Sequence, residues 1–352
     1  MVGFQSLKAR MLEDKEFEPF VDTRPTEPYW RANEKCYDTS DFRYHPKVPL
    51  GIRNEQPVPP PEKGSIRSDH LFCVEEITLP DHENVAPFLS TTRVLTHLCV
   101  GNFNEKSLNK RPIDIMIISV PGFGESSAHF DTGDLPKIIL SELLRQGYRK
   151  PHVVFLNPLG GGTKEFMQNK ELLSLVGLGD EIRDVEAITD HLLKTYKPKC
   201  DIIVMSHSLG ALRQLGVIRA VNKLNSNKVD EQISSTRAKI RQLVILNGTR
   251  GGFLDLVKMT AVVQASLWPV VTRNCCLELS PAEHRMMMFD SSTPDAEVRG
   301  YNERALPGSL RTFLELAVPI GQPNMLDVIR EAKTYGTDLR VDIVESEHDV
   351  LL

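Results

Sequence analysis

Residues 200–212 place a serine between an apolar, strand-like run and a helical pattern. Ser208 is flanked, two positions away on either side, by the small residues Ser206 and Gly210, which let a strand and a helix approach each other. A serine on such a strained turn projects its hydroxyl above a sheet, over the positive end of the helix dipole. The pattern predicts that Ser208 is a nucleophile and that the backbone N–H of Leu209 stabilises an oxyanion. A serine that only caps the helix is the alternative.

Two glycine-containing segments also follow predicted strands. The first contains Pro121-Gly122-Phe123-Gly124, where glycines allow a main-chain bend that presents N–H groups to a pocket. We predict the N–H of Phe123 as the second oxyanion donor, with an ordinary glycine turn as the alternative. The second segment, residues 157–163, lacks the GK[ST] ending of a phosphate-binding loop, and the full GxGxxG pattern of a dinucleotide site is absent. We therefore predict no cofactor.

Short runs, most of them nearly all apolar, predict the strands that position these loops. They are residues 70–79, 94–100, 113–120, 152–156, 201–205, 243–246 and 339–344. The first two are expected to form a hairpin-like pair, and the later ones have the composition of parallel strands buried on both faces. Helical patterns at residues 135–144, 182–192 and 209–218 alternate with them. The sequence therefore predicts an α/β fold, with a mostly parallel twisted sheet and helices on both faces.

Two parts of the chain depart from this regular alternation. Residues 1–66 are polar with scattered aromatics and end in a proline-rich connector, so we interpret them as an N-terminal arm that packs on the body or on a partner. Residues 67–352 form the main domain. Within it, proline-interrupted helical fragments at about residues 253–336 predict an inserted helical cap over the C-terminal edge of the sheet.

The three loops together resemble those of the α/β-hydrolase superfamily. Residues 121–124 resemble the oxyanion loop after the third strand of that family, residues 157–163 are similar to the glycine turn after the fourth, and residues 206–210 resemble the nucleophile elbow after the fifth. The resemblance extends from about residue 69 to residue 352. It implies the α/β-hydrolase fold, with Ser208 as the nucleophile and the N–H groups of Leu209 and Phe123 as the oxyanion hole.

The same resemblance implies an acid after a late strand and a histidine base beyond it. Asp349 is the candidate for the acid, but the chain stops three residues later with no histidine in the expected position. Three explanations stay open: a fragment or truncated product of a longer hydrolase, a base supplied from elsewhere by His348, His129 or His284, or a non-catalytic relative. His207 is interpreted as a wall of the site, because neighbouring side chains at such a turn diverge.

The composition argues against some classes of binding partner and predicts the cellular compartment. The 352 residues have a net charge of −5 with interspersed signs, which argues against nucleic-acid binding. The six cysteines include no CxxC pair, so no metal site is predicted and reduced thiols in the cytoplasm are expected. No signal-peptide core or membrane span is recognised. Homo-oligomerisation, or a partner bound by the N-terminal arm, stays open.

These observations predict a serine hydrolase that acts on a small carboxylic ester, lactone or related acyl compound through an acyl-enzyme. The alternative is a non-catalytic α/β-hydrolase-like protein that binds or scaffolds a partner, which would account for the missing histidine.

Overall fold

The computed structural model of the chain describes residues 50–53, 70–79, 92–100, 113–129, 135–157, 159, 173, 175–196, 201–226, 238–249, 276–277, 289, 293–317, 322–333 and 338–345. The candidate acid Asp349 and most of the first half of the expected cap, residues 253–275 and 278–288, lie outside these residues.

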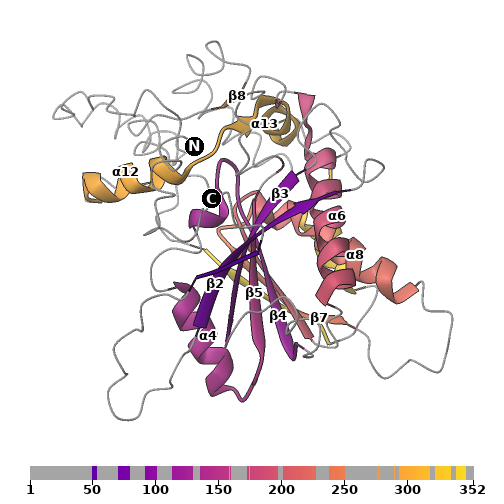
Figure 1. Cartoon of the computed structure of the whole chain (residues 1–352). Helices are drawn as coiled ribbons and strands as arrows, with labels where there is room; N and C mark the ends of the chain where they lie inside the picture. The colour runs from indigo at the N-terminus through magenta and orange to yellow at the C-terminus, as the bar shows by residue number, and fades with distance from the viewer. Residues whose placement is uncertain are drawn as a thin grey trace.

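A mixed sheet forms the centre of the fold (Figure 1), with its strands in the order β1-β2-β3-β5-β4-β6-β7-β10. They are β1 (Leu50–Arg53), β2 (His70–Thr78), β3 (Thr92–Val100), β4 (Ile115–Val120), β5 (Pro151–Leu156), β6 (Asp201–His207), β7 (Lys239–Leu246) and β10 (Arg340–Val344). The first three are antiparallel to their neighbours, and the other five run parallel to one another. Every run predicted as a strand lies in this sheet, and β2 with β3 confirms the hairpin-like pair.

The sequence pattern does not indicate β1. This four-residue strand lies within the N-terminal arm and pairs antiparallel with β2, with Leu50 opposite Glu75. At this point the arm therefore adds an edge strand to the sheet of its own chain.

Helices cover both faces of the sheet, because successive side chains of each central strand point to opposite sides. On β4, Ile115 and Ile117 pack with Leu140 of α4 (Leu135–Arg145), on one face. Met116 and Ile118 belong to the larger apolar cluster on the other face. That cluster includes residues of α6 (Leu178–Tyr196), α7 (Gly210–Arg213) and α8 (Leu215–Ser226). The predicted fold class is confirmed.

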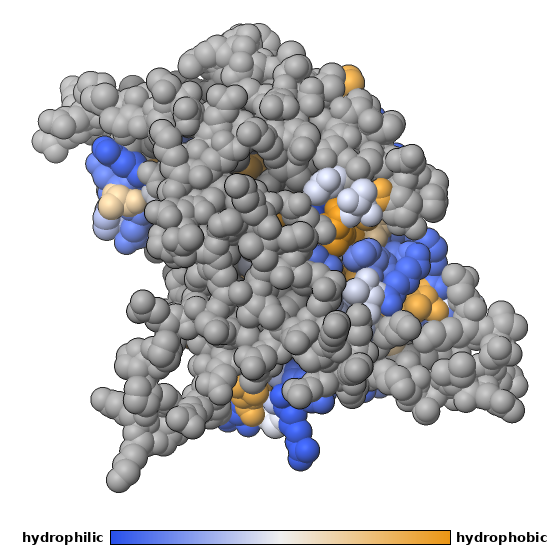
Figure 2. All heavy atoms as spheres, viewed as in Figure 1, coloured by the Kyte–Doolittle hydropathy of each residue, from blue (hydrophilic) through white to orange (hydrophobic). Residues whose placement is uncertain are grey.

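The outer surface of the α6 and α8 layer is mostly hydrophilic where the described residues are visible, with scattered apolar side chains (Figure 2). This distribution is that of a helix layer with one apolar face turned to a sheet. None of the helices in the described ranges is long and apolar enough to cross a membrane.

The chain between β7 and β10 contains three helices and a small sheet among its described residues. They are β8 (Cys276–Leu277), α12 (Asp295–Arg304), β9 (Gly308–Ser309), α13 (Leu310–Ala317) and α14 (Met325–Lys333). β8 pairs with β9, and α12 and α13 lie beyond one end of the main sheet (Figure 1). In contrast, Val328 of α14 belongs to the same core cluster as α8, so this helix packs as a crossover helix of the main layer. The domain boundaries stay a prediction.

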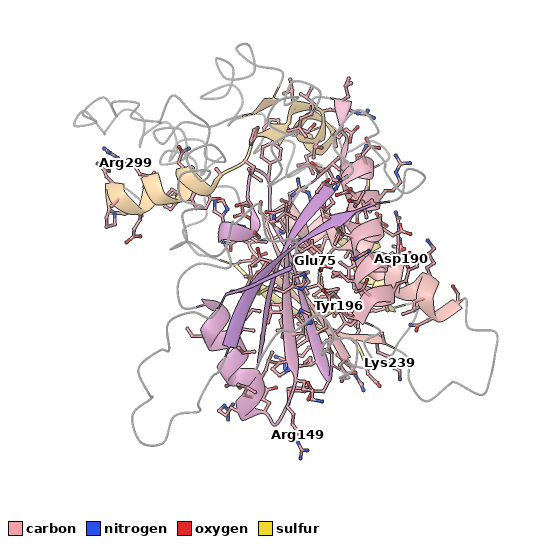
Figure 3. The ribbon with its side chains drawn as sticks, in the orientation of Figure 1. Glu75, Arg149, Asp190, Tyr196, Lys239 and Arg299 are labelled. Carbon is pink, nitrogen blue, oxygen red and sulfur yellow. The ribbon has the colours of Figure 1, made fainter. Side chains whose placement is uncertain are left out.

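A buried polar cluster lies between β2, β3, β5 and α6. The Glu75 carboxylate is 2.9 Å from Nε2 of His97 and accepts a 2.8 Å hydrogen bond from the hydroxyl of Tyr196. Figure 3 labels Glu75 and Tyr196. Nδ1 of His97 is 2.9 Å from Nε2 of His152.

Burial alone would raise the pKa of Glu75, but hydrogen bonds from His191, His97 and Tyr196 lower it below its usual range. Burial, and then the charge of His97, lower the pKa of His152 well below 6.5.

We predict that His152 makes the fold sensitive to mild acid. Below its unfolded pKa of about 6.5, the unfolded chain takes up a proton that the folded histidine refuses, so the free energy of unfolding falls by up to about 1.4 kcal/mol per pH unit. His152→Gln keeps a polar side chain without this titration. Urea unfolding at about pH 7 and about pH 5.5 should show a smaller loss for the variant than for the parent. Equal losses in both proteins would contradict the prediction.

Candidate functional site

Ser208 occupies a strained turn between β6 and α7. Its φ of 49° lies in the left-handed region, which among the described non-glycine residues only Asn247 shares. The Ser208 N–H donates to the carbonyl of Leu246 at 3.0 Å, and its own carbonyl accepts from the N–H groups of Ala211 and Thr249 at 3.1 and 3.0 Å. These bonds hold the turn from both the neighbouring strand β7 and the following helix. A strained serine backbone at a strand-to-helix turn is the geometry of a nucleophile elbow.

Two glycines bring the loop after β4 against this turn. A Cβ on Gly210 would lie 2.2 Å from the carbonyl oxygen of Val120, at the end of the paired strand β4. A Cβ on Gly122 would lie 2.9 Å from the Cβ of Ser208. At neither position is there room for a larger side chain, so these two glycines allow the loop and the elbow to lie this close together.

The two predicted oxyanion donors lie on the two sides of this contact. Within the described part of the chain, neither the N–H of Phe123 nor that of Leu209 is hydrogen-bonded to another group. Leu209 is buried and Phe123 is half-buried. N–H groups that are shielded from water are usually hydrogen-bonded in folded proteins, so two without a partner among the described residues, beside a strained serine, are suited to an anionic oxygen of a ligand.

A buried carboxylate joins the loop to the elbow from the other side. Oε2 of Glu125 accepts a 2.6 Å hydrogen bond from the N–H of Gly122, and Oε1 lies 2.8 Å from Nδ1 of His207. The hydroxyl of Tyr301 donates to Oε1 at 3.1 Å. Burial alone would raise the pKa of Glu125, but His207, His129 and the N–H of Gly122 lower it to about 2. The carboxylate is therefore ionised at neutral pH.

The segment from α12 to β9 covers the outer side of the same loop. The N–H of Leu306 donates to the carbonyl of Gly124 at 2.7 Å. Gly308 lies so close to the ring of Phe123 that a Cβ would be 2.1 Å from a ring carbon. The rings of Phe123 and Phe313 are 5.9 Å apart. The side chain of Phe123 is thus fixed by residues from the chain between β7 and β10.

Arg213 lies at the base of the site, one helical turn beyond the elbow. Its Nη1 donates to the carbonyls of Pro121 at 3.0 Å and Gly122 at 2.7 Å. Its other nitrogens pair with the carboxylate of Glu181 on α6, with both contacts at 3.0 Å. The two side chains are 3% and 5% exposed, so the ion pair is buried.

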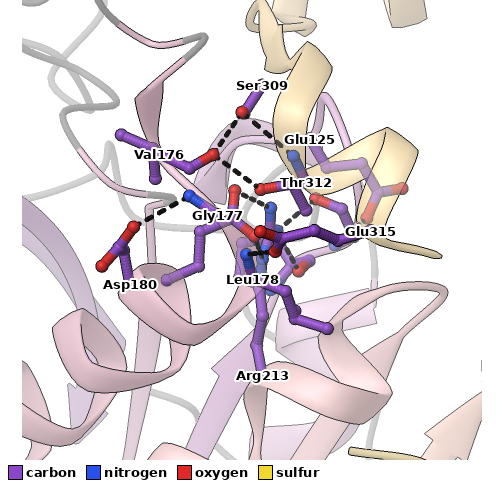
Figure 4. Close-up of polar contacts among 12 residues, drawn as sticks. Glu125, Val176, Gly177, Leu178, Asp180, Arg213, Ser309, Thr312 and Glu315 are labelled. Carbon is purple, nitrogen blue, oxygen red and sulfur yellow. Dashed lines mark hydrogen bonds and ion pairs between the residues drawn. The ribbon is translucent and has the colours of Figure 1, made fainter. Parts of the chain in front are cut away.

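The beginning of α6 is in turn attached to α13 (Figure 4). Oγ of Ser309 and Oγ1 of Thr312 donate to the carbonyl of Val176. Glu315 accepts a 2.7 Å hydrogen bond from the N–H of Leu178 at the start of α6. A carboxylate at a helix N-terminus satisfies a free N–H and interacts favourably with the helix dipole.

The structure brings three of the four predicted site residues together. Ser208, Leu209 and Phe123 meet where β4 and β6 end, whereas Asp349 lies outside the described residues, so its role stays a prediction. Of the candidate bases, His348 and His284 also lie outside them. His129 is directed elsewhere, with Nδ1 near the N–H of Ser126 at 3.0 Å and Nε2 near the carbonyl of Tyr301 at 3.2 Å.

Sequence reasoning missed the charged residues that organise the loop. His207, expected to be a wall of the site, contacts Glu125, a residue that no sequence pattern singles out. Arg213 lies one position away from the apolar stripe of its helix, and this position only weakly indicates that the side chain is buried. No group of three or more His, Cys, Asp and Glu side chains in the described ranges is arranged to hold a metal ion.

Comparisons with solved structures find weak likenesses to several enzymes. A peroxisomal α/β-hydrolase, Lpx1 of Saccharomyces cerevisiae, has 8% identity and a TM-score of 0.40 over 78% of this chain and 82% of its own. Homoserine O-acetyltransferase of Staphylococcus aureus has 14% identity and a TM-score of 0.43 over 80% and 81%. A bacterial brefeldin A esterase has 12% identity and a TM-score of 0.38 over 99% and 86%. No family model and no curated protein matches the chain.

At such identities, the likeness concerns the course of the backbone alone. The strand order, the helices on both faces and the strained serine turn after β6 are features of this chain itself, and they make its fold that of the α/β-hydrolases.

The close approach at Gly210 gives a prediction about stability. Gly210→Ala places a methyl group against the Val120 carbonyl and should lower the free energy of unfolding by about 2 kcal/mol or more. The matched control is Gly179→Ala on α6, where no atom lies within 4 Å of the added Cβ. That substitution should be neutral or stabilising, because alanine favours helix over glycine by about 1 kcal/mol. Urea unfolding of both variants tests the pair, and equal effects would refute the role of Gly210.

The buried carboxylate gives a second prediction. Glu125→Ala leaves the N–H of Gly122 and the imidazole of His207 without their partner and should cost about 3 kcal/mol of stability at neutral pH. Because the folded pKa is depressed from 4.5 to about 2, this contribution is complete above pH 4.5 and is lost as the pH falls through that window. Glu297→Ala, at an exposed site on α12, is the control and should leave the unfolding midpoint unchanged. If Glu125→Ala has the same unfolding midpoint as the control, the Glu125 carboxylate does not stabilise the fold.

Proposed function

We propose that this protein is a serine hydrolase that cleaves a small carboxylic ester, lactone or related acyl compound through an acyl-enzyme. The observation that carries the proposal is the strained Ser208 with two N–H groups on either side of it, those of Leu209 and Phe123, that have no hydrogen-bond partner within the described residues. A helix cap needs neither a positive φ nor free donors on a second loop, so the arrangement favours chemistry over capping.

In this mechanism, Oγ of Ser208 forms a bond to the acyl carbon while its proton passes to a base. The carbonyl oxygen becomes an oxyanion and accepts hydrogen bonds from the N–H groups of Leu209 and Phe123. The carbon–oxygen bond to the alcohol then breaks, and the alcohol leaves with the proton. Water attacks the acyl-enzyme in the same way and regenerates the serine. An oxyanion donor removed by mutation typically costs 100- to 1,000-fold in rate, so the two donors supply a large share of the catalysis.

The base and its orienting acid belong to the proposal as sequence predictions. Asp349 is the proposed acid, and the base is sought among His348, His284 or a residue supplied from elsewhere. Within the described residues, Oγ of Ser208 has no hydrogen-bonded partner, which agrees with a base located outside them. The cap assigned to about residues 253–336 would then provide the substrate pocket, and the cytoplasm is the proposed compartment.

Labelling with a fluorophosphonate probe tests the proposal. The full chain should form a covalent adduct on Ser208, because the probe phosphonylates serines that have a base and an oxyanion hole, with loss of fluoride. Ser208→Ala should abolish the adduct, and Ser226→Ala, a serine at the end of α8, should leave it unchanged. The adduct is located by mass spectrometry of the digested protein. A folded sample without Ser208-dependent labelling would refute the enzyme and favour the non-catalytic, partner-binding alternative.

A further inference from the structure

The direction of the Phe123 N–H is set by the atom at the opposite end of its peptide group. That group joins Gly122 to Phe123, so it contains the carbonyl of Gly122. In a trans peptide, the C=O and the N–H point in opposite directions, and the described residues contain no cis peptide. Because Arg213 holds the Gly122 carbonyl at 2.7 Å, the Phe123 N–H must point away from Arg213.

The preceding peptide group is fixed in the same manner. Its carbonyl, that of Pro121, also accepts from Nη1 of Arg213, at 3.0 Å, and its N–H, that of Gly122, donates to Glu125. Two consecutive peptide groups therefore present four polar groups, and charged side chains bind three of them. The fourth is the N–H of Phe123, which has no partner among the described residues and is available to a ligand.

Arg213 is itself held rigidly in place. Its guanidinium is almost completely buried and is paired through two nitrogens with the carboxylate of Glu181. A planar guanidinium bound in this two-point geometry has little rotational freedom. Arg213 belongs to α7, the helix that begins at the elbow. Its hydrogen bonds to the loop carbonyls therefore keep the loop in a fixed position relative to Ser208.

A cation on the carbonyl also changes the amide chemically. Electron density drawn toward the carbonyl oxygen leaves the amide hydrogen more positive, and hydrogen bonds that share a group strengthen each other. The N–H of Phe123 is therefore a stronger donor with Arg213 in place than without it.

We propose that Arg213 is a positioning residue of the oxyanion site, which aims and polarises the Phe123 N–H through the carbonyl of Gly122. The inference rests on the proposed hydrolase function and adds to it a residue that touches neither substrate nor Ser208. Glu181 has the separate task of neutralising Arg213 in the core.

The test compares two variants that differ only at position 213. Glu181→Gln removes the charge of the pair but keeps an amide oxygen that accepts from the guanidinium, so Arg213 stays on the loop carbonyls. The double variant Glu181→Gln with Arg213→Met leaves no buried unpaired charge and removes the loop contacts. We expect the single variant to react with the fluorophosphonate probe within about threefold of the parent, and the double variant about 30-fold or more slowly, because misdirecting a donor costs part of the loss for deleting it.

A steady-state measurement separates positioning from general damage. With p-nitrophenyl acetate as substrate, the double variant should lose kcat with little change in KM, since an oxyanion donor acts in the transition state. Arg213→Lys, which keeps a positive charge beside Glu181 but not the planar fork, should fall between parent and double variant. It also serves as the folded alternative if the double variant does not fold, as judged by thermal melting.

The outcomes distinguish this inference from the function on which it rests. If the parent labels at Ser208 but all three variants label at equal rates, Arg213 does not position the donor and the hydrolase stands. If Glu181→Gln alone loses as much as the double variant, the effect comes from the core ion pair, and the inference is likewise overturned. If the parent does not label, the function fails and the inference fails with it.

Discussion

The arrangement of the candidate site depends on the close contact between the main chain after β4 and the helix after β6. It exists because Gly210 and Gly122 have no side chain to keep Val120 and Ser208 at a distance. The same contact places the N–H groups of Leu209 and Phe123, which have no partner among the described residues, on the two sides of the serine. It also brings Arg213 within reach of the loop carbonyls. Removing the contact would therefore separate Ser208 from the N–H of Phe123.

Buried charges keep this contact in one arrangement. Glu125 and Arg213 bind the loop from opposite sides, and each is paired with a second charged or titratable group, His207 and Glu181 respectively. Burying such pairs costs desolvation energy, and apolar residues of equal size are often as stable. Here the pairs do what apolar contacts cannot, because hydrogen bonds to particular carbonyl and N–H groups fix the direction of a peptide, and packing alone does not.

The sequence was sufficient for the strands of the sheet and the fold class, and it located the loops that carry Ser208, Leu209 and Phe123, whose roles stay predictions. Long apolar runs predict strands buried on both faces, and the spacing of Ser206, Ser208 and Gly210 predicts the elbow, because these are local properties of the chain. The partnerships of Glu125 and Arg213 could not be predicted in this way. Glu125 meets Tyr301, which is 176 residues further on, and this pairing depends on how the finished layers pack. The strand β1 was missed because four residues in a polar arm give too short a pattern.

The attachment of the segment around α12 to the loop has a consequence for engineering. Tyr301, Leu306 and Gly308 each contact a different one of three successive loop residues, Glu125, Gly124 and Phe123. A chimera that takes this segment from another protein of the same fold would lose the Tyr301 hydroxyl, the Leu306 N–H and the glycine at position 308, on which the loop depends. The segment and the loop should therefore be exchanged together in such a chimera.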